Sequence, residues 1–203
     1  MGVNVRDLRC KIRDSYEAII LEDHDFAESH DVEQALWRLH YKQIEEFRTR
    51  LRKSMAATTA TSSGPTIPMP GAKNITRSEP VHKVLASFKS FLSEAKGFYH
   101  ELILKLRAKH GLPQDFFSTE EINCSNNQKS AADLKRCQLS CHRCLIYLGD
   151  LARYKELHGD ADGQNHDWSV AANYYLKAVS FWPASRNPHN RAGQTWCNCR
   201  FKN

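Results

Sequence analysis

The sequence predicts an all-α protein built as an antiparallel array of helices. Apolar residues recur at spacings of three and four along most of the 203 residues, which is the pattern of helices with one buried face. A strand alternates apolar and polar residues, and no segment of the sequence shows that alternation. A chain of this length is also sufficient for one domain with a hydrophobic core of its own.

The first two helices are marked by their apolar faces and by the residues at their ends. The acidic stretch 22–31 ends the first helix. Asp31 caps the second, because Gln34 three residues later completes a capping-box pattern, and this helix runs to about Lys53. The first apolar face consists of Val5, Leu8, Ile12, Tyr16 and Ile19, and the second of Trp37, Tyr41, Ile44, Phe47 and Leu51.

Residues 54–74 are rich in Ala, Thr, Ser and Pro, which predicts a flexible insertion within the domain. The longest helix begins near Ser78, and Gly111 and Pro113 end it. A polar loop, residues 114–131, follows. The apolar seam of the longest helix consists of Val81, Leu85, Phe88, Leu92, Ala95, Tyr99, Leu102 and Leu106.

The stretch 137–154, CQLSCHRCLIYLGDLARY, predicts the helix around which the others pack. Its apolar face consists of Cys137, Cys141, Cys144, Leu148 and Leu151, and its far side of His142, Arg143, Asp150 and Arg153. A mid-helix glycine costs about 1 kcal/mol relative to alanine, so Gly149 indicates a close contact on the backbone. Asp167 caps a last helix that runs to Trp182. Offsets typical of a tetratricopeptide repeat predict that these two helices pack as an antiparallel pair, with Gly149 near a small residue.

Composition narrows the classes of partner. The formal net charge of +6 favours an acidic partner: a phosphorylated peptide, an acidic protein or a nucleic acid. We expect no membrane partner, because no apolar run approaches the roughly 18 residues that span a bilayer. The odd number of cysteines, 7, without a secretory signal, predicts reduced thiols in the cytosol or nucleus.

The three cysteines of the central helix, together with His142, invite a zinc interpretation. The outer two are separated by about 10 Å along a helix axis, whereas zinc needs each sulfur at about 2.3 Å. Free cysteine is also a good core residue, so we expect core packing, no metal and no cofactor. No phosphate-binding loop or catalytic triad is present in the sequence, and we therefore expect neither an enzyme nor a small-molecule substrate.

Two pairs of adjacent aromatic and basic residues, Tyr41-Lys42 and Arg153-Tyr154, are candidates for binding. In the commonest arrangement such a cation lies on a solvated helix face while its aromatic neighbour packs inward. The basic segment 48–53 is an alternative contact for RNA or DNA, although it lacks interleaved aromatic residues for base stacking.

Three segments resemble the EST/SMG family of telomerase-associated and nonsense-mediated mRNA decay factors, and most closely its plant SMG-seven type: DVEQALWRLHYKQIEEFR at 31–48, CHRCLIYLGDLARYK at 141–155 and AANYYLKAVSFWPASRNPHN at 171–190. The resemblance implies a 14-3-3-like helical domain over residues 1–190, incomplete at its C-terminal end. It also implies that Lys42 and Arg153 line a phosphoserine pocket with Tyr154 beside them. Arg38 and Arg77 widen the basic rim in this interpretation.

The resemblance further implies an adaptor in the cytoplasm and nucleus that binds a phosphorylated RNA helicase of mRNA surveillance. Two alternatives remain: a telomerase-associated protein that binds RNA or telomeric DNA, and a scaffold fragment without a pocket. The tail 191–203 departs from the family pattern, which indicates a frameshift, an unspliced intron or an alternative final exon. We expect this tail to be disordered.

Overall fold

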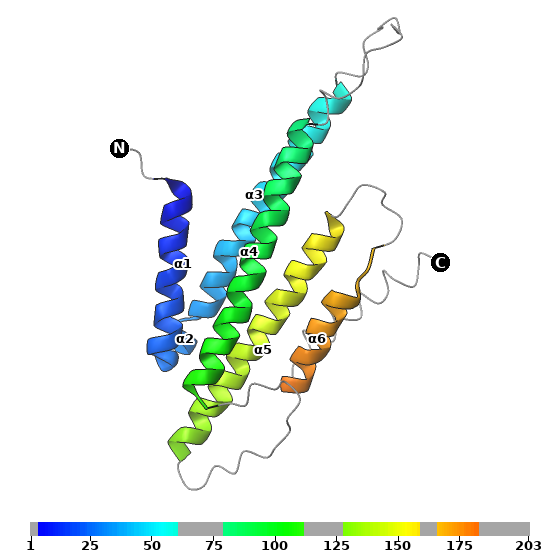
Figure 1. The fold of residues 1–203 in the computed structure, drawn as a ribbon. Coiled ribbons are helices and arrows are strands. Elements are labelled where there is room, and N and C mark those ends of the chain that lie inside the picture. The colour runs from blue at the N-terminus through cyan, green and yellow to red at the C-terminus, as the bar shows by residue number, and fades with distance from the viewer. Residues whose placement is uncertain (1–3, 61–78, 112–127, 159–165, 183–203) are drawn as a thin grey trace, which may run out of the picture.

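The computed structural model describes residues 4–60, 79–111, 128–158 and 166–182, and these residues form helices and no strand. The expected all-α array is therefore confirmed (Figure 1). The helices are α1 (Val5–Glu22), α2 (His24–Ser29), α3 (Val32–Ala60), α4 (Glu79–Lys109), α5 (Gln128–Leu157) and α6 (Ser169–Phe181). Arg77 and the tail 191–203 lie outside the described residues.

Helices that follow one another in the chain also pack against one another. The long helices α3, α4 and α5 lie side by side, with α1 at one side of the array and α6 at the other (Figure 1). α6 packs on α5, and α1 contacts both α3 and α4. In the part of the chain that the structure describes, no helix is long and apolar enough to cross a membrane.

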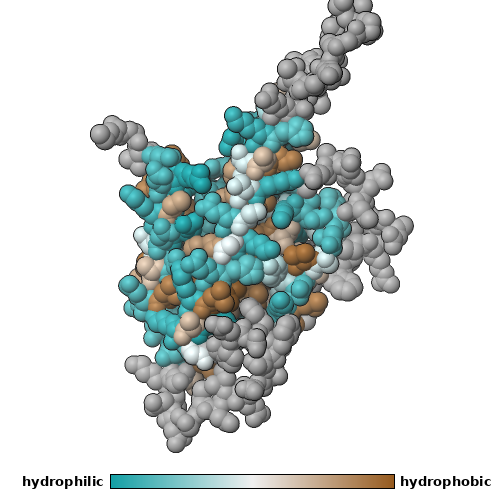
Figure 2. Space-filling view, in the orientation of Figure 1, coloured by the Kyte–Doolittle hydropathy of each residue, from teal (hydrophilic) through white to brown (hydrophobic). Residues whose placement is uncertain are grey.

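The core lies where the expected apolar seams meet. Cys137, Cys141 and Cys144 are at most 1% exposed, which confirms that they pack in the core. The α1 face is less complete than its spacing suggests, because Val5 is 59% exposed and Leu8 48% exposed. On the coloured part of the face seen in Figure 2, hydrophilic residues predominate and hydrophobic residues appear in patches among them. Large side chains buried in the core include Ile20, Leu36, Ile44, Phe88, Leu92, Tyr99, Leu102, Leu106, Leu145 and Leu148.

Both sides of α5 are covered, which corrects the expectation of a far polar side. His142 and Asp150 are buried, because α6 packs over them. The Nδ1 atom of His142 lies 2.7 Å from the Ala178 carbonyl oxygen, and the hydroxyl of Tyr175 donates to Oδ1 of Asp150 at 2.8 Å. Gly149 does receive a close contact, but from the large ring of Tyr175 rather than from a small residue.

Three boundaries differ from expectation. The acidic stretch contains the short helix α2, whose N-terminus is capped by the Asp23 side chain, which accepts from Phe26 N at 3.0 Å. α3 continues to Ala60 into the expected insertion, because alanine is the best helix former. α5 begins at Gln128, within the expected loop. The N-cap residue of α6 is Trp168 and not the expected Asp167, although the Asp167 carboxylate does accept from Ser169 N at 2.9 Å.

Candidate functional site

A groove of about 520 Å³ lies between α3 and α5. α3 contributes residues at spacings of three and four, so one edge of the helix faces the groove. The last two turns of α5 form the opposite wall. The lining residues are Gln34, Trp37, Arg38, Tyr41, Asp150, Arg153 and Tyr154.

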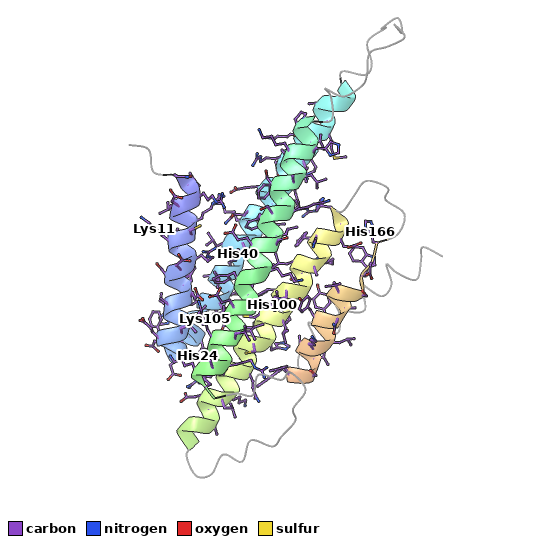
Figure 3. All side chains as sticks on the ribbon, in the orientation of Figure 1. Lys11, His24, His40, His100, Lys105 and His166 are labelled. Atoms are coloured by element: carbon purple, nitrogen blue, oxygen red, sulfur yellow. The ribbon has the colours of Figure 1, made fainter. Side chains whose placement is uncertain are left out.

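The aromatic wall on α3 is supported from behind. Trp37 stacks on Tyr147 of α5, with ring centroids 4.6 Å apart and planes 4° from parallel. One turn further, His40 Nδ1 lies 3.0 Å from the Tyr99 hydroxyl of α4. Burial lowers the pKa of His40 to about 4, so its ring is neutral at pH 7. Figure 3 labels His40 among the side chains between the helices.

A buried charge network fixes the position of α3 against α5. Glu33, directly before the groove residue Gln34, is 3% exposed and accepts from Arg143 Nη1 at 2.8 Å and from the Ser140 hydroxyl. His24 Nε2 of α2 lies 2.7 Å from the same hydroxyl. Burial raises the pKa of Glu33, but hydrogen bonds from His24, Arg143 and Ser140 outweigh that effect, and the pKa is lowered. The carboxylate therefore stays ionised and holds the two walls of the groove together.

Arg153 has the features of an anion ligand. Its Cζ lies 5.7 Å from the centre of the Tyr154 ring. Its Nε is buried and makes no hydrogen bond with any residue that the structure describes. Across the groove, Arg38 donates to the neutral side chain of Gln34 at 3.0 Å. Within the described residues, neither arginine forms an ion pair, so both cations remain available to an anion in the groove.

Arg48, in the basic segment considered as an alternative contact for nucleic acid, is not among the lining residues but lies next to one of them, Tyr154. Its Cζ lies 5.8 Å from the centre of the Tyr154 ring, and its Nη1 pairs with Glu45 at 2.5 Å. Burial raises the pKa of Tyr154, so its hydroxyl stays protonated and can donate a hydrogen bond.

The structure brings Arg38, Arg153 and Tyr154 together in one groove. Lys42 is exposed on α3, one turn after Arg38, and is not among the lining residues. Arg38, expected only to widen the rim, is thus placed closer to the groove than Lys42. The contact of Lys42 with a phosphate stays a prediction, and so does that of Arg77.

Comparison with known proteins finds one matching family model and several related proteins. Residues 31–159, which include every lining residue of the groove, match the family model described as "Telomerase activating protein Est1". The chain is 45% identical to the nonsense-mediated mRNA decay factor SMG7 of Arabidopsis thaliana over 183 aligned residues. These residues make up 89% of this chain and 17% of the Arabidopsis protein. It is 26% identical to the telomerase-binding protein EST1A of Danio rerio over 186 aligned residues. These residues make up 91% of this chain and 10% of the Danio rerio protein.

A third relative is the nonsense-mediated mRNA decay factor SMG5 of Homo sapiens. It is 29% identical over 114 residues, which cover 53% of this chain and 11% of the human protein. The chain therefore spans less than a fifth of the length of each of these three relatives.

Proposed function

The chain belongs to the Est1 family of telomerase-activating proteins, and from this premise we propose that it is a phosphoprotein-binding adaptor in nonsense-mediated mRNA decay. The groove between α3 and α5 receives a phosphoserine or phosphothreonine of the partner. The partner is the phosphorylated RNA helicase of mRNA surveillance. The protein acts by binding in the cytoplasm and nucleus, without catalysis.

One observation carries this proposal: Arg38 and Arg153, from two different helices, line one groove and have no carboxylate partner among the described residues. A phosphate brings about two negative charges and three acceptor oxygens. An arginine fork matches two of those oxygens with parallel N–H groups. Two arginines on opposite walls can therefore hold one phosphate from both sides.

The surroundings favour a peptide over a free ion. Tyr41 is 41% exposed at the rim, where it can pack against the backbone of an extended peptide. The Tyr154 hydroxyl adds a donor, and Arg48, which is paired with Glu45, lies over the Tyr154 ring. Lys42 extends the basic rim by one turn of α3. Asp150 is the acidic residue of the lining, and Tyr175 already donates to it.

The test is the affinity of the full chain for one peptide in its phosphoserine and unphosphorylated forms, measured by fluorescence anisotropy. Arg153→Glu replaces attraction by repulsion, so we expect it to weaken phosphopeptide binding by more than tenfold, since a charge-assisted hydrogen bond contributes about 1.5–3 kcal/mol. Arg52→Glu is the matched control: the same charge change on an exposed residue of α3 outside the groove. Equal affinity for the two peptide forms would leave a plain helical scaffold as the better account.

A second candidate function is nucleic-acid binding, favoured by the telomerase-binding name of the Danio rerio relative and by the basic end of α3. Arg48 and Arg50 there lie over the rings of Tyr154 and Phe47. Affinity for RNA or DNA that falls steeply with salt, together with indifference to peptide phosphorylation, would favour this candidate.

A further inference from the structure

Two histidines from distant parts of the sequence meet at one end of the helical array. His24 is the first residue of α2, and His110 directly follows the last residue of α4. Their ring centroids lie 5.4 Å apart, and the ring planes are tilted by 46°. Figure 3 labels His24 at the end of the array where α2 lies. Neither histidine lines the groove between α3 and α5.

The proton on the His24 ring is placed by a relay of two hydrogen bonds. Glu33 accepts from the Ser140 hydroxyl, which uses the one proton of that hydroxyl. The Ser140 oxygen also lies 2.7 Å from His24 Nε2, so it accepts from an Nε2–H group. In the neutral ring, Nδ1 of His24 then carries a lone pair and no proton.

Both rings present a buried nitrogen that has no partner. In the described part of the chain, neither Nδ1 of His24 nor Nε2 of His110 makes a hydrogen bond, although both atoms are shielded from solvent. The side chain of His24 is 9% exposed. Buried polar atoms are almost always paired, and an unpaired one in a native fold indicates an ion, a water or a functional role. Two such atoms on neighbouring imidazole rings point to one shared ligand.

We propose that His24 and His110 bind one divalent transition-metal ion of the zinc type, through Nδ1 of His24 and Nε2 of His110. Imidazole nitrogens are preferred ligands of such ions. A tetrahedral zinc ion with bonds of about 2.0–2.1 Å to two imidazoles holds the ring centres roughly 5 Å apart, because each centre lies about 1 Å behind its nitrogen. The observed separation of 5.4 Å fits this arrangement. The ion joins α2 to the end of α4.

The relay to Glu33 is the outer support that a metal-bound histidine usually has. A ligating imidazole typically donates its other N–H group to a carboxylate, a carbonyl or a water, which fixes the tautomer. Here the Ser140 hydroxyl lies between the His24 ring and the carboxylate.

Water completes the coordination of the ion. Among the described residues, no group of three or more His, Cys, Asp or Glu side chains is placed to hold a metal, so the site has two protein ligands there. His110 is only partly buried, which leaves a side from which water reaches the ion. The expectation of no metal was argued from the cysteines, whereas His24 and His110 are brought together only by the fold.

The experiment is a zinc titration of the full chain, followed by calorimetry and by the melting temperature. At a free zinc concentration of about a hundred times Kd, we expect the melting temperature to rise by roughly 5 °C. His24→Gln and His110→Gln should each weaken zinc binding by more than about tenfold, because each removes one of two ligands. His100→Gln is the matched control, since its Nε2 already lies 2.9 Å from the Tyr174 hydroxyl, and it should change the affinity by less than about twofold.

Cobalt separates this site from the cysteines of the chain. Cobalt bound by imidazole and water gives no thiolate charge-transfer band, and its absorption should be lost in His24→Gln. If wild type and His24→Gln give the same cobalt spectrum, or if zinc affinity is unchanged in both His24→Gln and His110→Gln, the ion binds elsewhere and the proposal is wrong. Absence of zinc binding would likewise overturn it and leave two packed rings.

Ser140→Ala tests the relay while it keeps both imidazoles. Without the hydroxyl, the Nε2–H group of His24 loses its acceptor, and zinc binding should weaken by about tenfold. Ring nitrogen NMR shifts of metal-free protein should show the Nε2–H tautomer of His24 in wild type and a mixture of tautomers in Ser140→Ala. A wild-type ring that carries its proton on Nδ1 would block the metal position and would overturn the proposal.

Discussion

Among the described residues, the groove between α3 and α5 and a larger groove both carry arginines, and the two grooves differ in what their arginines already bind. The larger one, about 620 Å³, lies between α1, α3 and α4 and includes Arg9 and Arg13. Arg9 pairs with Glu46 of α3 at 2.7 Å, and Arg13 pairs with Glu94 of α4 at 3.3 Å. In the smaller groove between α3 and α5, the described residues offer no such partner to Arg153.

The difference shows that neither groove volume nor the number of arginines identifies a phosphate site. An arginine that is already paired with a carboxylate attracts an incoming anion less, because the pair is close to neutral. The pairs of the larger groove connect α1 to α3 and α4, and exposed pairs of this kind contribute about 0–1 kcal/mol each to stability. Unpaired cations on two facing helices are the feature that distinguishes the smaller groove.

The strongest test of this comparison is one charge reversal in each groove. Arg153→Glu removes two charge-assisted hydrogen bonds to the phosphate. It should therefore weaken the free energy of phosphopeptide binding by about 3 kcal/mol, which is about a hundredfold in affinity. Arg9→Glu should leave that affinity within about twofold and lower the free energy of unfolding by about 1 kcal/mol, since it removes one exposed pair. Anisotropy titrations and urea melts of both variants give the two quantities. A large loss of affinity in Arg9→Glu would show that the binding site is the other groove.

The next largest effect is on stability, and it concerns Gly149, where the α5 backbone behind the smaller groove contacts the Tyr175 ring. Gly149→Ala should lower the free energy of unfolding by about 2 kcal/mol. The new methyl group overlaps the buried Tyr175 ring, and the energetic cost of this overlap exceeds the gain in helix propensity. Gly97→Ala on α4 is the matched control, since nothing lies within 4 Å of its added Cβ. It should stabilise the fold by about 0.5–1 kcal/mol. Equal denaturation midpoints for the two variants would contradict the close contact.

Mild acid should lower the stability of the fold through His40, one of the residues that line the larger groove. Burial lowers the pKa of folded His40 to about 4, with Arg13 adding to the effect, whereas the unfolded chain titrates near 6.5. Between these values only the unfolded chain binds the proton, so stability falls as the pH falls through that window.

From pH 7 to 5 this histidine alone accounts for a loss of about 2 kcal/mol. Urea melts of the wild-type protein and of His40→Gln at both pH values isolate the effect, because the other histidines are common to both proteins. The pKa of Glu33 is also lowered, but its contribution is lost only at lower pH. Identical pH slopes for the two proteins would rule out His40 as the source.

The smallest effect ranks the two basic residues of α3. Arg38 lines the smaller groove and Lys42 does not, so Arg38→Glu should weaken phosphopeptide binding by about tenfold, and by at least as much as Lys42→Glu. The same titrations measure both. A larger loss in Lys42→Glu would show that Lys42 reaches the phosphate and that α3 contributes two cations.

Spacing was sufficient to predict the five longer helices, the buried cysteines and the pair formed by α5 and α6, because those features follow from local periodicity. The short helix α2 was not predicted, because six residues are too few to show that periodicity. The pairing of Arg153 with Tyr154 was also visible in the sequence. The burial of Asp150 was not, since it depends on α6 covering a side of α5 that looks polar. The order of Arg38 and Lys42 depends on the rotation of α3, which Trp37 sets by stacking on Tyr147.

The network around Glu33 has a consequence for folding kinetics. Most helix contacts join elements adjacent in the chain, and such local contacts form quickly. Ser140 and Arg143, in contrast, lie 107 and 110 residues after Glu33, so bringing them together closes a long loop. Bonds of this kind are expected to form after the rate-limiting step. They therefore slow unfolding rather than speed folding, and they set how long the two walls of the groove stay together once assembled.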